Sequence, residues 1–149
     1  MKSIAFTEVV ELGGTCEQLF DHMVNPETAS TVDPFIVEWH ADDYPPKVGT
    51  HNRLRAKFGP FKMRITSRFI ECDPPHRMVV QGVSPPMSRW TRTIHDLEEI
   101  PGGMRYTNTL EMIPPIGFRT ISRILSRTMH KGVLEGCERL LAAFGPPTP

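Results

Sequence analysis

Hydrophobic and polar positions alternate along most of the chain before its last segment. Leu54, Ala56 and Phe58, for example, alternate with basic residues, and a period of two is typical of a strand with one buried face. Gly59 and Pro60 then predict a hairpin turn. Prolines divide the alternating segments, because proline is poorly tolerated inside central strands and helices. The pattern predicts about seven strands, over residues 4–12, 35–40, 49–59, 61–73, 78–83, 87–99 and 105–112.

Two short helices are predicted between the first and second strands. Thr15 and Gln18 fit a capping box, in which a hydroxyl and an amide side chain satisfy N–H groups at the start of a helix. Asn25 provides a second cap, with Pro26 at the first helical position, and predicts a short helix toward Thr31. Both helices therefore follow the first strand.

The last segment changes to a helical period. Apolar residues recur at three- and four-residue steps over residues 117–144, which predicts a long amphipathic helix that ends at Gly145 and Pro146. Sequential strands joined by short turns favour an antiparallel sheet. The predicted fold class is α+β, with a curved antiparallel sheet wrapped around the C-terminal helix. We expect one domain over residues 1–149, in which residues 146–149 form a tail.

Composition narrows the functional classes. The chain has 149 residues, of which 39% are hydrophobic and 23% charged, and its formal net charge is zero. General nucleic-acid binders are usually basic, so no nucleic-acid partner is predicted. No apolar stretch is long enough for stable membrane insertion or for a signal peptide. The three cysteines are widely spaced, which favours a reducing, cytoplasmic location.

Four segments resemble motifs of one known superfamily, and one of them is residues 48–50, which resemble the glycine turn before its third strand. Residues 71–78 (ECDPPHRM) resemble its strand-end pattern of an acid, two spacers, Pro-Pro and a basic residue leading into the next strand. Residues 15–20 resemble its first helix, and residues 102–107 resemble the glycine turn before its last strand. The sequence departs from the pattern at Val32, where a tryptophan is often found, and at Met104, where a threonine is.

In this order, the motifs are similar to those of the START-like (SRPBCC, helix-grip, birch-pollen-allergen-like) superfamily, in its polyketide cyclase/dehydrase and lipid-transport branch. The resemblance runs over residues 3–144. It implies a helix-grip fold and a cavity between sheet and helix that holds a hydrophobic or aromatic, lipid- or polyketide-like molecule. No nucleotide-binding signature occurs, and no histidine lies at metal-ligand spacing, so neither a cofactor nor a metal is predicted.

Polar side chains on apolar strand faces mark the candidate site. Tyr106 and Asn108 share a face of the last predicted strand with Leu110. In the preceding strand, Arg92 is assigned to the same apolar face as Trp90. Ligand pockets are mostly apolar with a few convergent polar groups, which is this pattern. The predicted ligand-binding residues are Trp39, Phe58, Phe69, Trp90, Arg92, Tyr106, Asn108, Leu110, Met129 and Val133.

An enzymatic function is the first alternative. The resemblance implies an aromatase/cyclase or dehydrase in which an interior Arg, Tyr or Asn polarises a carbonyl or holds an enolate. Arg92, Tyr106 and Asn108 are the candidate catalytic residues. A purely structural interpretation also stays open, because Asn108 can satisfy a backbone group and Arg92 can reach the rim or be reversed by a bulge.

A co-chaperone-like protein interaction module is the second alternative. It would use five basic residues on the outer face of the predicted hairpin, although cross-strand pairing with Glu38 and Asp42 is the simpler interpretation. A homodimer through an edge strand is also compatible with the sequence. The five basic residues are Arg53, Arg55, Lys57, Arg64 and Arg68.

Overall fold

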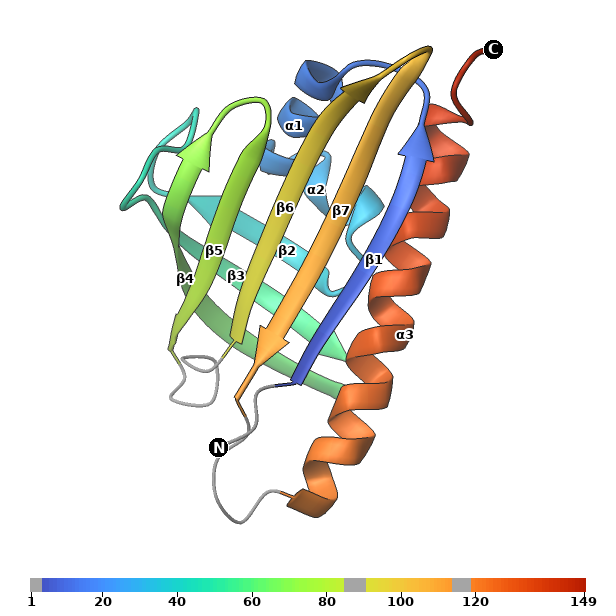
Figure 1. Ribbon diagram of the computed structural model, residues 1–149. Coiled ribbons are helices and arrows are strands. Elements are labelled where there is room, and N and C mark those ends of the chain that lie inside the picture. Colours follow the sequence, from blue (N-terminus) through green and yellow to red (C-terminus); the bar gives the residue numbers. More distant parts are fainter. Residues whose placement is uncertain (1–3, 85–90, 114–118) are drawn as a thin grey trace.

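The computed structural model describes residues 4–84, 91–113 and 119–149 (Figure 1). Its elements follow the predicted order of one strand, two short helices, six further strands and one long helix. They are β1 (Ile4–Leu12), α1 (Cys16–Val24), α2 (Ala29–Val32), β2 (Ile36–Ala41), β3 (His51–Phe58), β4 (Phe61–Asp73), β5 (Arg77–Ser84), β6 (Thr91–Ile100), β7 (Gly103–Met112) and α3 (Arg119–Phe144).

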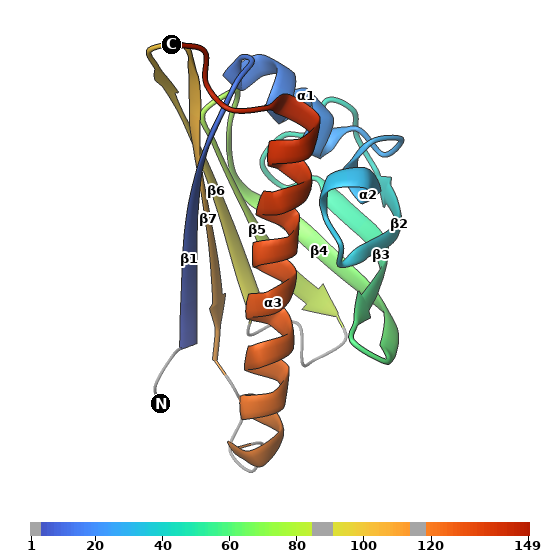
Figure 2. The same cartoon turned by 90° about the vertical axis from the view of Figure 1, so that its right-hand side faces the viewer.

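The strands form one antiparallel sheet in the order β1-β7-β6-β5-β4-β3-β2. Strands β2 to β6 each pair with the next strand in the chain, and β1 pairs with β7 at the end of this order. Figure 2 shows the sheet curved around α3, with β1 and β7 on one side of the helix and β2 and β3 on the other. Two register shifts in the pairing of β4 with β5 help this curvature, because a bulge bends its strand. The predicted α+β helix-grip fold is confirmed.

Two of the predicted helix ends are confirmed. Thr15 Oγ1 accepts the Gln18 N–H at 3.2 Å, while the Gln18 side chain accepts the Thr15 N–H at 3.0 Å. At the other end of the chain, Gly145 stops α3 with a φ of 72°, a left-handed conformation that glycine adopts at little cost. The predicted first residues of this helix, 117 and 118, lie outside the described residues.

The second short helix begins later than predicted. Asn25 does act locally, but its Oδ1 accepts the N–H of Glu27 at 2.9 Å and closes a turn of the Asx type. Residues 26–28 belong to that turn, and the helix starts at Ala29. A cap and a turn use the same side-chain chemistry, and here the turn prevails.

The outer face of the sheet carries exposed ion pairs. Arg53 contacts Asp42 at 3.2 Å and Arg55 contacts Glu38 at 3.7 Å, so the predicted cross-strand pairing is confirmed for these two. Such exposed pairs contribute little to stability, because solvent screens the charges. The remaining basic residues predicted on this face have no ion pair with another described residue. Within the described residues, no helix is both long and apolar enough to cross a membrane.

Candidate functional site

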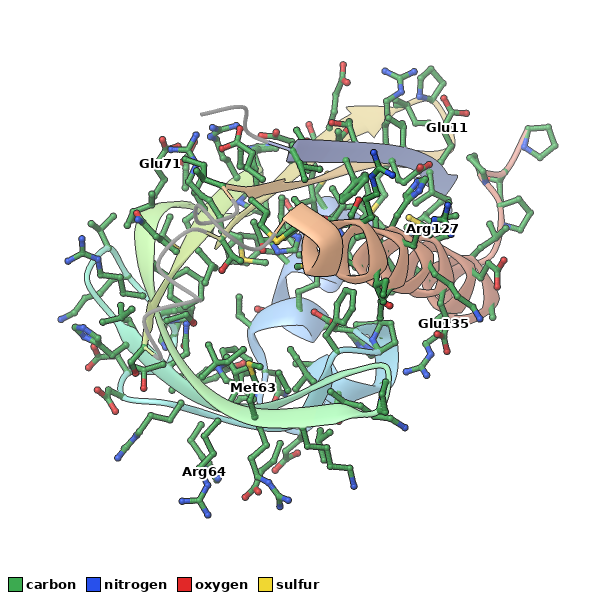
Figure 3. All side chains as sticks on the ribbon, turned by 90° about the horizontal axis from the view of Figure 1, so that it is seen from below. Glu11, Met63, Arg64, Glu71, Arg127 and Glu135 are labelled. Atoms are coloured by element: carbon green, nitrogen blue, oxygen red, sulfur yellow. The ribbon has the colours of Figure 1, made fainter. Side chains whose placement is uncertain are left out.

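A cavity of about 540 Å³ lies between the inner face of the sheet and α3. Strands β2 to β7 all contribute side chains to it, as do the three helices and the segment between α2 and β2. Alternation along β4 explains how one strand serves two environments. Met63, Ile65 and Ser67 line the cavity, whereas Arg64 is exposed. Figure 3 shows Met63 on the inner side of the curved sheet and Arg64 pointing away from it.

Helix α3 supplies one wall and approaches the segment before β2 closely. Met129 and Val133 are buried and face the cavity. Gly132 lies between them in the sequence, and a methyl group added there would overlap the ring of Phe35. The absence of a side chain at Gly132 therefore allows Phe35 to pack against the helix at the cavity wall.

Most of the sequence-predicted residues come together in this cavity. Of the ten residues, Trp90 lies outside the described residues, and the structure does not describe the side chain of Phe58. Arg92 is considered separately below. The seven that line the cavity are Trp39, Phe69, Tyr106, Asn108, Leu110, Met129 and Val133. Their contact with a ligand remains a prediction.

The assignment of Arg92 to the inner face is wrong. Arg92 is exposed, and its Nε donates to Glu111 Oε2 at 3.0 Å across the outer side of the β6–β7 pair. In β6 the inner residues are instead Thr91, Thr93 and His95. The prediction failed because successive residues of a strand face opposite sides, so a shift of one residue reverses the whole strand.

An apolar patch on the outer face explains why the sequence pattern predicts the wrong inner face for β6. Ile94 is apolar, which favours an inner position, yet it shares the outer face with Arg92. It is nevertheless buried, and it pairs with the buried Val79 of β5. Hydrophobicity thus marks both faces of this part of the sheet.

The His95 side chain of β6 faces the cavity and contacts Tyr106 of β7. This contact was not predicted from the sequence. His95 Nδ1 and the Tyr106 hydroxyl are 2.6 Å apart, and the rings are stacked with centroids at 5.9 Å. Burial lowers the pKa of His95 to about 4, so the ring is neutral near pH 7. Burial also raises the pKa of Tyr106 well above its usual range. The site therefore holds a neutral imidazole–phenol pair that shares one hydrogen bond.

Asp33 adds a carboxyl group to the same cavity. It lies between α2 and β2, where its Oδ1 accepts the Phe35 N–H at 2.9 Å. Burial raises its pKa to about 6, although this hydrogen bond and the charge of Arg139 oppose the shift. Its negative charge contributes to the raised pKa of Tyr106. No sequence pattern marks Asp33 as functional, since aspartate before proline is common in turns.

Three further polar residues line the cavity. The Asn52 amide donates to Ser67 Oγ at 3.4 Å, and both side chains are buried. The Oδ1 atoms of Asn52 and Asn108 are buried with no hydrogen-bond partner in the described part of the chain. An unpaired buried acceptor costs about 1–3 kcal/mol, so these groups lower the stability of the fold.

The comparisons with known proteins find similarity at the level of structure. No family model and no curated protein matches the sequence. The di-domain ARO/CYC StfQ from the steffimycin biosynthetic pathway superposes with a TM-score of 0.76 at 12% identity, over 96% of this chain and 50% of StfQ. The Polyketide_cyc-like protein Cgl2372 from Corynebacterium glutamicum gives a TM-score of 0.64 at 19% identity, over 95% of this chain and 89% of its own.

A third similar structure is Ara h 8.0201, with a TM-score of 0.65 at 12% identity, over 95% of this chain and 99% of that protein. The chain spans about half the length of StfQ. Sequence identities this low establish the fold alone. The similarity predicted from the sequence motifs is confirmed at that level: the chain has the helix-grip fold that these structures share.

Proposed function

We propose that this protein binds a mainly apolar, ring-containing small molecule, lipid- or polyketide-like in character, between its sheet and α3. The observation that carries the proposal is the cavity of about 540 Å³, bounded by apolar side chains and by the His95–Tyr106 pair. Cavities of about 300–1,000 Å³ hold typical small-molecule ligands. Apolar walls favour an apolar ring system, while the phenol and the Asp33 carboxyl offer directed polar contacts at particular points.

Native mass spectrometry of the purified protein provides the first test. We expect a retained mass that is released on denaturation, or one-to-one binding of an added hydroxyanthraquinone to protein freed of ligand. Val133 is 3% exposed and lines the cavity, whereas the next residue, Leu134, is 41% exposed. Val133→Trp should therefore weaken hydroxyanthraquinone binding by at least about tenfold, because it fills the site, and Leu134→Trp should not. Equal binding by the two variants would contradict the proposal.

Catalysis of an intramolecular condensation is the second candidate function, favoured by the polar groups within the cavity. Two structural neighbours, an ARO/CYC and a Polyketide_cyc-like protein, support this direction. The Asp33 carboxyl has a pKa of about 6, which suits a general base near neutral pH. The Tyr106 phenol stays protonated and can donate to a carbonyl oxygen. His95 is a positioning residue that holds the phenol through the 2.6 Å hydrogen bond.

The step uses a linear chain of β-ketone units as substrate. The Asp33 carboxylate removes a proton from a methylene between two carbonyl groups, and the enolate carbon forms a bond to a more distant carbonyl carbon. The Tyr106 hydroxyl gives its proton to the oxygen of that carbonyl and regains one from Asp33. Loss of water from the resulting alcohol then produces the ring double bond. Asn108 remains a candidate for orienting the chain, whereas Arg92 is placed outside the cavity.

A linear β-polyketone thioester tests this second function through the appearance of aromatic absorbance. We expect Asp33→Asn and Tyr106→Phe to lower turnover by at least about a hundredfold, the usual contribution of general acid–base groups. The chain has two tyrosines, and the other, Tyr44, is 59% exposed, so Tyr44→Phe is the matched control. Unchanged turnover in both cavity variants would exclude these roles and would leave the binding proposal intact.

A further inference from the structure

A second group of chemically active side chains lies outside the cavity, where three elements meet. Cys16 is the first residue of α1, His76 lies in the turn between β4 and β5, and Glu99 lies near the end of β6. One possible ligand atom from each of the three lies within 4.8 Å of the other two. None of the three lines the cavity. Figure 1 shows α1, the β4–β5 turn and this end of β6 at the same end of the molecule.

The backbone holds this arrangement in place. The N–H of Leu97 donates to the His76 carbonyl at 2.8 Å, which ties the turn to β6 two residues before Glu99. The N–H of His76 in turn donates to the Asp73 carbonyl at 2.8 Å and closes the turn itself. Cys16 has no exposed surface and belongs to the apolar core around α1. The three side chains are therefore carried by anchored segments.

We propose that Cys16, His76 and Glu99 form a binding site for a zinc ion, with water as the fourth ligand. A thiolate, an imidazole and a carboxylate are the three side-chain ligands that zinc uses, and three protein ligands leave one position open. Bond lengths of about 2.0–2.2 Å to nitrogen and oxygen place these atoms about 3.3 Å apart in a tetrahedron. His76 Nε2 and Glu99 Oε1 are 3.3 Å apart.

The geometry fits a shared ion better than a cysteine nucleophile. A nucleophile needs a base in hydrogen-bond contact with the thiol and a path for the substrate. No hydrogen bond joins the Cys16 thiol to the His76 ring among the described contacts, and the thiol is shielded from solvent. His76 and Glu99 are exposed and provide a path for an ion. Binding forms the zinc–sulfur bond and releases the thiol proton to solvent.

The expected consequence is structural. An ion at this site connects the start of α1, the β4–β5 turn and the end of β6, three segments that are distant in the sequence. Because the unfolded chain lacks the preformed site, binding adds directly to the free energy of unfolding. The inference is independent of what the cavity binds.

Metal titration of the full chain, after removal of ions with a chelator, tests the proposal. We expect one zinc ion per chain by calorimetry, a rise in Tm with zinc, and a thiolate-to-metal charge-transfer band when cobalt(II) replaces zinc. Cys16→Ser should abolish the band, and His76→Ala or Glu99→Gln should weaken zinc binding by at least about tenfold. His76 and Glu99 are exposed, so their variants should keep the fold even if Cys16→Ser loses it.

Two other positions provide matched controls. Cys72 is a free thiol of β4 that does not belong to the three-residue cluster, and His51 is an exposed histidine of β3. Cys72→Ser and His51→Ala should leave the stoichiometry, the affinity and the cobalt band unchanged. Failure to bind zinc one-to-one would overturn the proposal. So would binding that His76→Ala and Glu99→Gln leave at full strength, or a cobalt band that depends on Cys72.

Discussion

His95 and Asp33 share the cavity, and burial shifts their pKa values in opposite directions. For His95 the pKa falls from 6.5 to about 4 in the folded state, so its contribution to stability is lost as pH falls through that window. For Asp33 the pKa rises from 3.8 to about 6, so its contribution is present at low pH and is lost as pH rises through that window. Between about pH 4 and 6 the two contributions oppose each other.

Asp33→Asn separates these two contributions. Asparagine keeps an acceptor for the Phe35 N–H but cannot ionise, so only the His95 contribution remains in this window. The free energy of unfolding should therefore rise more steeply between pH 4 and 6 than in the wild type, with a gain of about 1–3 kcal/mol near pH 7. Urea denaturation across a pH series measures this. Parallel curves for variant and wild type would show that Asp33 titrates normally.

The His95–Tyr106 hydrogen bond leads to a second prediction at the same scale. Tyr106→Phe removes the buried hydroxyl and leaves a ring nitrogen of the half-buried His95 without its partner, which should cost about 1–3 kcal/mol. Tyr44→Phe at the exposed tyrosine should change the free energy of unfolding by less than about 0.5 kcal/mol. Denaturant midpoints compare the two variants, and equal effects would mean that the short contact contributes nothing to stability.

At the scale of the element, the glycines of α3 differ in what surrounds them. A methyl group at Gly132 would overlap the Phe35 ring, whereas at Gly136 the nearest atoms would be 3.5 Å away, an ordinary contact. Alanine favours a helix interior by about 1 kcal/mol over glycine. Gly136→Ala should therefore stabilise the protein by up to about 1 kcal/mol. Gly132→Ala should destabilise it by about 1–3 kcal/mol, because Phe35 must move.

Thermal unfolding of these two helix variants provides a direct comparison, since both substitutions carry the same gain in helix propensity. Any difference between them reports the local packing rather than the helix. If Gly132→Ala is as stable as Gly136→Ala, Phe35 does not pack against α3 in solution.

Three features were predicted correctly from local signals. The capping box at Thr15 and Gln18, the hairpin turn at Gly59 and the helix stop at Gly145 each depend on a few neighbouring residues, and all three are confirmed. The facing of β6 depends on its pairing with two other strands, which local pattern does not specify. Arg92 was therefore placed inward, and the inward His95 was missed.

Long-range contacts explain the rest of what the sequence did not reveal. Tyr106 was identified because it lies on an apolar face, but its hydrogen bond to His95 requires the register of β6 with β7. Asp33 precedes a proline in a turn and shows no pattern at all. Cys16 and Glu99 are far apart in the sequence and meet only through the fold. Spacing rules detect ligand sets within one segment, and this set comes from three.

At the scale of the whole molecule, the cavity connects stability to ligand binding. The side chains around a space of about 540 Å³ lose contacts that a packed core would provide. A ligand that binds only the folded state restores them and adds about 2.7 kcal/mol to the free energy of unfolding at a concentration of 100 Kd. For a domain of this size, that corresponds to a rise in Tm of about 5–11 °C.

Val133→Trp should separate these two properties. The indole occupies space that the ligand would use, so the ligand-free variant should be at least as stable as the ligand-free wild type if the cavity accepts it without strain. Adding the hydroxyanthraquinone should then raise the Tm of the wild type and of Leu134→Trp, but not that of Val133→Trp. Scanning calorimetry with and without the ligand measures both effects. A full ligand-induced shift in Val133→Trp would place the binding site outside the space between the sheet and α3.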